Sequence, residues 1–177
     1  MNAAHELRTS RLWLEPLRAA HAREVFDAYA DPELWRFFPA LRPPDVESLA
    51  IRFRRWLAGP PPGSAADLHE NWIAYDDARA VGLFQATLFT DGEGALAYAV
   101  FAPFQRRGYA REATRNIVAH LFDVHAVRCV SADVDARNAP SIALLQALGM
   151  RVASRRPASA NDHEAGEDLH FELLRPD

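Results

Sequence analysis

Cysteine is nearly absent from this sequence of 177 residues, and long apolar runs are missing as well. The one thiol, Cys129, lies in the mostly apolar run 126–130, which predicts a small buried side chain. A single cysteine excludes an internal disulfide framework and argues against a cysteine-based zinc site. Residues 1–9 lack the apolar segment of a secretory signal, and no stretch approaches the roughly 20 apolar residues that span a bilayer. We therefore expect a cytoplasmic protein with no membrane partner.

The sequence also lacks an excess of basic residues. Its 24 acidic and 20 basic side chains give a net charge of −4. Nucleic-acid-binding proteins usually carry a basic excess, so this composition predicts no nucleic-acid partner. Hydrophobic residues make up 49% and charged residues 25%, as in ordinary globular proteins. The length fits one compact domain over residues 1–177.

Hydrophobic periodicity divides the chain into alternating strand-like and helix-like segments separated by turn residues. Two loops rich in small or charged residues are expected at 59–68 and 157–168. The expected elements, in order, are a strand at 10–17, a helix at 19–30, a short helical piece after Asp31, a helix at 45–58, strands at 71–75, 80–89 and 94–101, a helix at 108–122, a strand at 127–134, a helix at 140–148, and strands at 150–154 and 169–174.

The segment 94–134 reads as strand, helix and strand, and such a crossover makes its two strands parallel. The three strands before the crossover follow one another through short turns, which favours antiparallel pairing. We therefore predict an α/β protein with one domain: a mostly antiparallel mixed sheet with one parallel strand pair and about four helices.

Residues 105–113 carry the clearest chemical signal, because they follow a strand and open a helix. The first turn of a helix leaves N–H groups unpaired at the positive end of its dipole, which suits a phosphate. Gly108 and Ala110 leave room for a ligand near the backbone, and Arg106 and Arg107 add positive charge. The alternative is an ordinary helix start with solvated arginines. The segment lacks the Gly-Lys-Ser/Thr of a P-loop, so ATP-type binding has no support.

A second segment agrees with the first and makes the pattern specific. Gln105-x-x-Gly108-x-Ala110 resembles the coenzyme A signature of the GNAT acetyltransferase superfamily. The segment 133–141, with its Asn-x-x-Ser, and the following 148–150 (Leu-Gly-Met) are similar to that family's strand, turn and helix ending. The opening segment 9–17 is similar to ribosomal-protein N-terminal acetyltransferases. The resemblance covers nearly the whole chain.

The resemblance implies that acetyl-coenzyme A binds between two splayed strands, 98–101 and 127–134. Its pyrophosphate would accept hydrogen bonds from the main-chain N–H groups of 106–110. The amides of its pantetheine arm would pair with the main chain of Val100 and Phe101, as an added strand would. Asn138 would hydrogen-bond the pantetheine, and Ser141 would donate a proton to the leaving thiolate. The cofactor-binding set implied in this way is Val100, Phe101, Gln105, Arg106, Arg107, Gly108, Tyr109, Ala110, Asn138 and Ser141.

The sequence departs from the family pattern at three places. Position 106 is arginine where many relatives have glycine, which crowds the turn. Ala153 and Ser154 stand where a glutamate is frequent. The segment 143–148 has no tyrosine to act as acid, so Ser141 is the hydroxyl available there.

Transfer to an amine needs a base, a polarised carbonyl and a proton for the thiolate. A backbone N–H near Val100 could polarise the carbonyl. The base candidates are Asp133, Glu70 and His69, although acidic residues at strand ends are more often simply solvated. Asp135 is expected to cap the following turn. The catalytic set predicted here is Ser141, Asn138 and Asp133.

The substrate side is expected to be built by the first two helices and the long loop. The substrate-binding prediction comprises Trp35, Phe38 and Tyr98, with core packing as the alternative role for each. Asp31 or Glu33 could attract a cationic amine. An aromatic wall over the acetyl end would consist of Trp35, Phe37, Phe38 and Trp56.

The seven histidines show no ligand spacing, so we expect surface or packing roles and no metal site. His120 and His125 are five positions apart, and His163 and His170 are seven apart.

Three functions are compatible with these patterns. The favoured one is an acetyl-CoA-dependent acyltransferase that acetylates a primary amine of a protein N-terminus or a small molecule. The missing glutamate and tyrosine favour instead a non-catalytic acyl-CoA-binding sensor or scaffold. The third is an interaction domain that uses Arg52, Arg54 and Arg55. A homodimer is compatible with the sequence, which does not set the oligomeric state.

Overall fold

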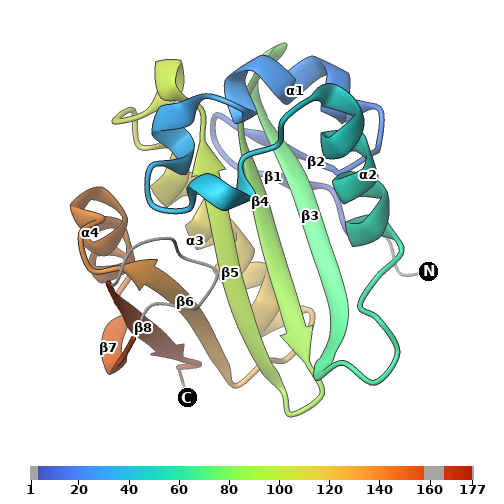
Figure 1. Cartoon of the computed structure of the whole chain (residues 1–177). Helices are drawn as coiled ribbons and strands as arrows, with labels where there is room; N and C mark the ends of the chain where they lie inside the picture. The colour runs from blue at the N-terminus through green and yellow to red at the C-terminus, as the bar shows by residue number, and fades with distance from the viewer. Residues whose placement is uncertain (1–3, 158–165, 177) are drawn as a thin grey trace.

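The computed structural model describes residues 4–157 and 166–176, which form one eight-stranded sheet with helices on both faces (Figure 1). The strand order across the sheet is β1-β2-β3-β4-β5-β6-β8-β7. The strands are β1 (Leu7–Arg8), β2 (Trp13–Pro16), β3 (Ala66–Asp76), β4 (Arg79–Phe89), β5 (Glu93–Val100), β6 (Cys129–Asp135), β7 (Arg151–Pro157) and β8 (Glu167–Leu174).

Within the described residues four α-helices connect the strands, and α2 and α4 begin at a side-chain cap. The Asp45 side chain accepts the Ser48 N–H at 2.7 Å and begins α2, while Asn138 accepts the Ser141 N–H at 3.3 Å and begins α4. The helices are α1 (His21–Tyr29), α2 (Val46–Leu57), α3 (Tyr109–Asp123) and α4 (Ala139–Ala147), with short 3₁₀ turns η1 (Pro32–Trp35), η2 (Pro39–Leu41) and η3 (Ala102–Phe104).

The alternation of side chains along the central strands produces two apolar layers. On β3, Trp72 packs on the face that α3 covers, whereas Ile73 faces the layer built with α1 and α2. Trp72, Ile73 and Phe53 of α2 are fully buried, and burial of a side chain of this size stabilises the fold by about 1.5–3 kcal/mol. The part of the sheet where the family resemblance places the cofactor is formed by β5, β6 and the start of α3.

The parallel pair β5 and β6 separates soon after it begins. Only Glu93 to Ala95 pair with Cys129 to Ser131, and all other neighbouring strands in the sheet are antiparallel. Beyond Ala95 the two strands diverge, as Figure 1 shows, and β6 continues along β8 through its full length. The second half of β5 therefore has one sheet edge open toward β6.

The predicted class is confirmed: residues 4–157 and 166–176 form one α/β domain with a mixed sheet, one parallel pair and four α-helices. Cys129 is buried, as predicted. The loop predicted at 59–68 is too long, because β3 begins at Ala66 and takes in the last three of these residues. Pairing with the full length of β4 outweighs the weak strand preference of these polar residues. Most of the loop expected at 157–168 lies outside the described residues.

Candidate active site

The turn before α3 has the backbone shape that the signature requires. Gly108 has φ +82°, and Arg106 also takes the left-handed conformation, with φ +59°. The first helical hydrogen bond runs from the Glu112 N–H to the Gly108 carbonyl at 3.0 Å. The N–H groups of Tyr109, Ala110 and Arg111 precede it and therefore have no acceptor within the helix. The positive end of the helix dipole lies at the same place, so the donors and the dipole both favour a bound anion.

A set of hydrogen bonds around Glu112, which the sequence did not predict, holds this turn against the N-terminal segment. Glu112 Oε1 accepts the Thr9 hydroxyl at 2.6 Å and the Arg11 N–H at 3.0 Å, and Oε2 accepts Arg11 Nε at 2.7 Å. Burial opposes ionisation of Glu112, but the hydrogen bonds from Thr9, Arg11 and Ser10 outweigh it and lower the pKa. Three partners lie about a hundred positions from Glu112, so spacing along the chain gives no signal for this contact.

Arg11 also contacts the turn directly. Its Nη1 donates to the Arg107 carbonyl at 3.1 Å, and its guanidinium lies 4.7 Å from the centre of the Tyr109 ring. The Tyr109 side chain is buried, and its hydroxyl donates to Asp76 at 2.5 Å. Tyr109 can therefore offer a ligand only its main chain, while the exposed Arg106 and Arg107 can offer their charges.

Hydrogen bonds within the main chain reduce the number of N–H and carbonyl groups that are free to pair with a pantetheine arm. The Phe101 N–H donates to the Val81 carbonyl at 2.9 Å, and the Phe101 carbonyl accepts the Phe104 N–H at 2.9 Å. Both groups of Phe101 already have main-chain partners, and its pairing with the cofactor stays a prediction. Because bonding alternates along an antiparallel pair, the N–H groups of Val100 and Tyr98 point to the open edge.

The Gln105 side chain makes a contact inside the protein. Its Nε2 donates to the Val100 carbonyl at 3.0 Å. The side chain therefore links the end of β5 to the turn before α3, and its part in cofactor binding stays a prediction.

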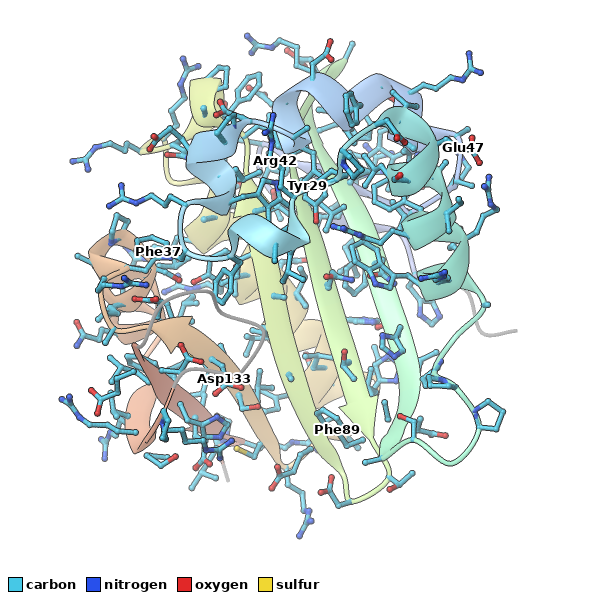
Figure 2. The ribbon with its side chains drawn as sticks, viewed as in Figure 1. Tyr29, Phe37, Arg42, Glu47, Phe89 and Asp133 are labelled. Carbon is cyan, nitrogen blue, oxygen red and sulfur yellow. The ribbon has the colours of Figure 1, made fainter. Side chains whose placement is uncertain are left out.

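A cavity of about 850 Å³ lies where β5 and β6 diverge, within the range of pockets that hold small ligands. Figure 2 labels three of its residues: Tyr29 on α1, Phe37 after η1, and Asp133 on β6. The lining comes from both diverging strands and the neighbouring β4, from α1, α2 and α4, and from the η1–η2 segment. The strands and α4 contribute Leu83, Gln85, Leu96, Ala97, Tyr98, Ala99, Ala132, Asp133, Val134, Asn138, Ser141 and Leu145.

Two hydroxyl groups meet across the divergence. The Tyr98 hydroxyl on β5 lies 2.6 Å from Ser141 Oγ on α4. Burial raises the pKa of Tyr98, although the Ser141 hydrogen bond opposes the shift. Sequence reasoning identified both residues but not their contact. Ser141 is thus not the only hydroxyl available at this place, because β5 supplies a second.

The structure separates the three base candidates. Asp133 lines the cavity, is largely exposed, and accepts a hydrogen bond from His170 Nδ1 at 2.7 Å. Glu70 is 1% exposed, lies on the face of the sheet that α3 covers, and bonds His120; its assignment as a base is wrong. His69 is not among the cavity's lining residues. Asp135 accepts the Arg137 N–H at 2.7 Å, which confirms its role in the turn.

The predicted aromatic wall lines the cavity, but the charged residues in the cavity lining are not the ones expected. Trp35, Phe37, Phe38 and Trp56 all contribute to the lining, together with Arg52 and Arg55 of α2. Asp31 and Glu33 do not line it; the Asp31 side chain accepts the Glu33 N–H and begins η1. This side of the cavity is therefore aromatic and positively charged.

Comparison with known proteins agrees with this geometry. The profile of the Acetyltransferase (GNAT) domain matches residues 11–151. Among solved structures, a GNAT-family acetyltransferase from Bacillus anthracis is 15% identical with TM-score 0.79, covering 96% of this chain and 98% of that one. RimL, a ribosomal L7/L12 α-N-protein acetyltransferase in complex with coenzyme A, is 10% identical with TM-score 0.82, covering 96% and 98%.

A third structure, spermidine N-acetyltransferase from Vibrio cholerae in complex with CoA and spermine, is 12% identical with TM-score 0.77, covering 93% of this chain and 96% of that one. A search of curated protein sequences gave no match. The chain belongs to the GNAT acetyltransferase family, since the profile covers most of its length. It is an acetyltransferase whose acetyl donor is acetyl-CoA. In the described part, no helix is long and apolar enough to cross a membrane.

Proposed function

We propose that this enzyme transfers acetyl from acetyl-CoA directly to the primary amine of a small molecule that carries an anionic group. The observation that carries the proposal is the cavity lined by both diverging strands, with the Gly108 turn beyond the end of β5 and with Arg52 and Arg55 in the lining.

The donor end fits coenzyme A in shape and charge. The N–H groups of Tyr109, Ala110 and Arg111 would hold the diphosphate, with Arg106 and Arg107 beside it. The N–H groups of Tyr98 and Val100 would hold the pantetheine amides. When bound, acetyl-CoA supplies an acetyl group activated as a thioester.

The hydroxyl pair of Tyr98 and Ser141 is placed to provide a proton at the acetyl end. Ser141 Oγ would hold the proton that a leaving thiolate takes, and Tyr98 would replace it through their 2.6 Å contact. Asp133, on the opposite strand of the cavity, would accept the proton of the incoming amine through water. Asn138 would keep Ser141 in place by starting α4.

The acceptor class follows from the charges of the lining. Asp133 is the one carboxylate among the described lining residues, against two arginines, Arg52 and Arg55. Arg52 is partly buried, and its guanidinium lies 5.7 Å from the centre of the Trp35 ring. A polyamine would meet like charge here, whereas a carboxylate or phosphate would gain charge-assisted hydrogen bonds. The aromatic side chains suit an apolar body.

Release of free thiol from acetyl-CoA tests both parts of the proposal. The panel should contain phenylalanine, phenethylamine (the same amine without its carboxylate), spermidine, and short peptides with free N-termini. We expect kcat/KM to be highest for the amine with a carboxylate. Absence of thiol release with every amine would contradict the transfer, and equal rates for phenylalanine and phenethylamine would contradict the acceptor class.

A matched pair of variants on α2 adds a control. Arg55 lines the cavity, while its neighbour Arg54 is bonded to Glu47 outside it. We expect Arg55→Gln to lower kcat/KM for the carboxylate-bearing amine about tenfold, as the loss of one charge-assisted hydrogen bond implies, and Arg54→Gln to leave it unchanged. A peptide preferred over every small amine would redirect the assignment to protein N-termini.

A further inference from the structure

Four side chains that the acetyl-transfer site does not use meet around one buried carboxylate. They are His5 before β1, Glu70 on β3, His120 in the last turn of α3, and His125 in the loop after α3. Each offers one nitrogen or oxygen atom, and these four atoms all lie within 4.8 Å of one another. Sequence spacing did not predict this group because its members come from three distant segments.

The distances between these atoms suit a tetrahedral metal ion. His120 Nε2 lies 2.9 Å and His125 Nε2 3.0 Å from Glu70 Oε2, and His5 Nδ1 lies 3.8 Å from Oε1. Zinc bonds of about 2.0–2.1 Å in a tetrahedron place neighbouring ligand atoms about 3.3 Å apart. Small side-chain movements would convert the present contacts into bonds to a central ion.

The burial pattern gives the group a reason to bind a cation. The Glu70 side chain is 1% exposed, and its described ion-pair partners are all histidines. A carboxylate so deeply buried needs positive charge beside it. A metal ion bound by Glu70 and its histidine neighbours would supply that charge. The His5 side chain is 58% exposed, so an ion has a path from solvent.

The surroundings hold the ligands in place. The Trp72 indole N–H donates to the His5 carbonyl at 2.7 Å, which fixes the N-terminal segment beside β3. The His120 ring lies edge-to-face against His125, with ring centres 5.0 Å apart, and against Trp72 at 6.1 Å. Because packing and hydrogen bonds of this kind already order the ligands, little conformational entropy is lost when an ion binds.

We propose that His5, Glu70, His120 and His125 form a structural zinc site that ties the N-terminal segment to β3 and to the end of α3. Imidazole nitrogens and a carboxylate oxygen are ligands that Zn²⁺ accepts in proteins, and they suit Mg²⁺ poorly. The group lies on the face of the sheet that α3 covers, whereas the cavity lies toward α1 and α2. The site is therefore expected to act on stability and to be separate from acetyl transfer.

Zinc titration of the full chain, free of any affinity tag and first treated with a chelator, tests the site. Isothermal calorimetry should give one Zn²⁺ per chain, and Co²⁺ should give the strong visible absorption of four-coordinate cobalt. The melting temperature should rise with the logarithm of free Zn²⁺, because the ion binds the folded state. Mg²⁺ should produce neither effect.

Variants assign the binding to these four residues. His5→Gln changes an exposed side chain and His125→Gln a loop residue, so both variants should fold. Each should weaken zinc binding at least about tenfold, as loss of a ligand or its support does. His69→Gln is the matched control, since His69 precedes Glu70 but points to the other face of β3. No saturable binding by the wild type, or affinity unchanged in either His5→Gln or His125→Gln, would overturn the proposal.

Discussion

Replacement of Gly108 by alanine tests the phosphate-binding turn most sharply, because its effects on stability and on cofactor affinity can be separated. Gly108 has φ +82°, and an added Cβ would lie 3.4 Å from Arg11 Nη2. The left-handed conformation costs an L-residue about 1–2 kcal/mol. Alanine also restricts the unfolded chain more than glycine does, which offsets about 0.4–1 kcal/mol of this cost. We expect a net loss of about 1 kcal/mol, or about 2–4 °C in Tm for a chain of this size.

The effect on cofactor affinity should be larger than the effect on stability. The new methyl group would contact Arg11 Nη2, and its strained backbone would disturb the turn that presents the N–H groups of Tyr109 and Ala110. Loss of one hydrogen bond between a backbone N–H and a charged phosphate is worth about 1.5–3 kcal/mol. We therefore expect the Kd of coenzyme A, measured by calorimetry, to rise about tenfold to a hundredfold.

Gly92 provides the matched control. It has φ +84° in the turn between β4 and β5, and its added Cβ would lie 3.4 Å from Arg128 Nε, so its local surroundings copy those of Gly108. Gly92→Ala should lower Tm by a similar amount and leave the Kd of coenzyme A unchanged. Equal affinities for the two variants would refute the placement of the diphosphate at the start of α3.

Two further predictions concern the hydroxyl pair and a buried histidine. Ser141→Ala should lower kcat about a hundredfold, the usual contribution of general acid catalysis, with the Kd of coenzyme A nearly unchanged; a collapse of binding instead would show that Ser141 holds the cofactor. His21 is 2% exposed, and burial, with the Arg18 charge, lowers its pKa from the ordinary 6.5. The unfolded chain therefore takes up a proton first, and the free energy of unfolding should fall as pH drops below 6.5. His21→Asn keeps an acceptor for the Arg18 N–H, so urea unfolding from pH 7.5 to 5.5 should show a shallower loss than the wild type; an identical slope would contradict this assignment.

Local patterns in the sequence were sufficient for the class of fold and for the start of α3. Strand alternation, the glycine at 108 and the Asn-x-x-Ser at 138–141 each depend on neighbours within a few positions, and such neighbours are visible in the chain. The divergence of β5 and β6 was expected only through the family resemblance. Residue patterns alone indicated that the pair is parallel, not where its pairing ends.

Contacts between distant segments account for what the sequence did not predict. Glu112 is braced by Thr9 and Arg11, and the histidine group gathers around Glu70 from three parts of the chain. The side a residue faces depends on strand register, and register placed Glu70 away from the cavity. The bond of the Phe101 N–H to Val81 is likewise a property of the sheet and not of neighbouring residues in the chain.

A crystal structure of the acetyl-CoA complex would show whether the cofactor lies between β5 and β6. We expect the diphosphate within hydrogen-bond distance of the N–H groups of Tyr109 and Ala110, pantetheine paired with Tyr98 and Val100, and the sulfur beside Ser141. A cofactor bound outside the space between β5 and β6, or a diphosphate held away from the first turn of α3, would contradict this placement.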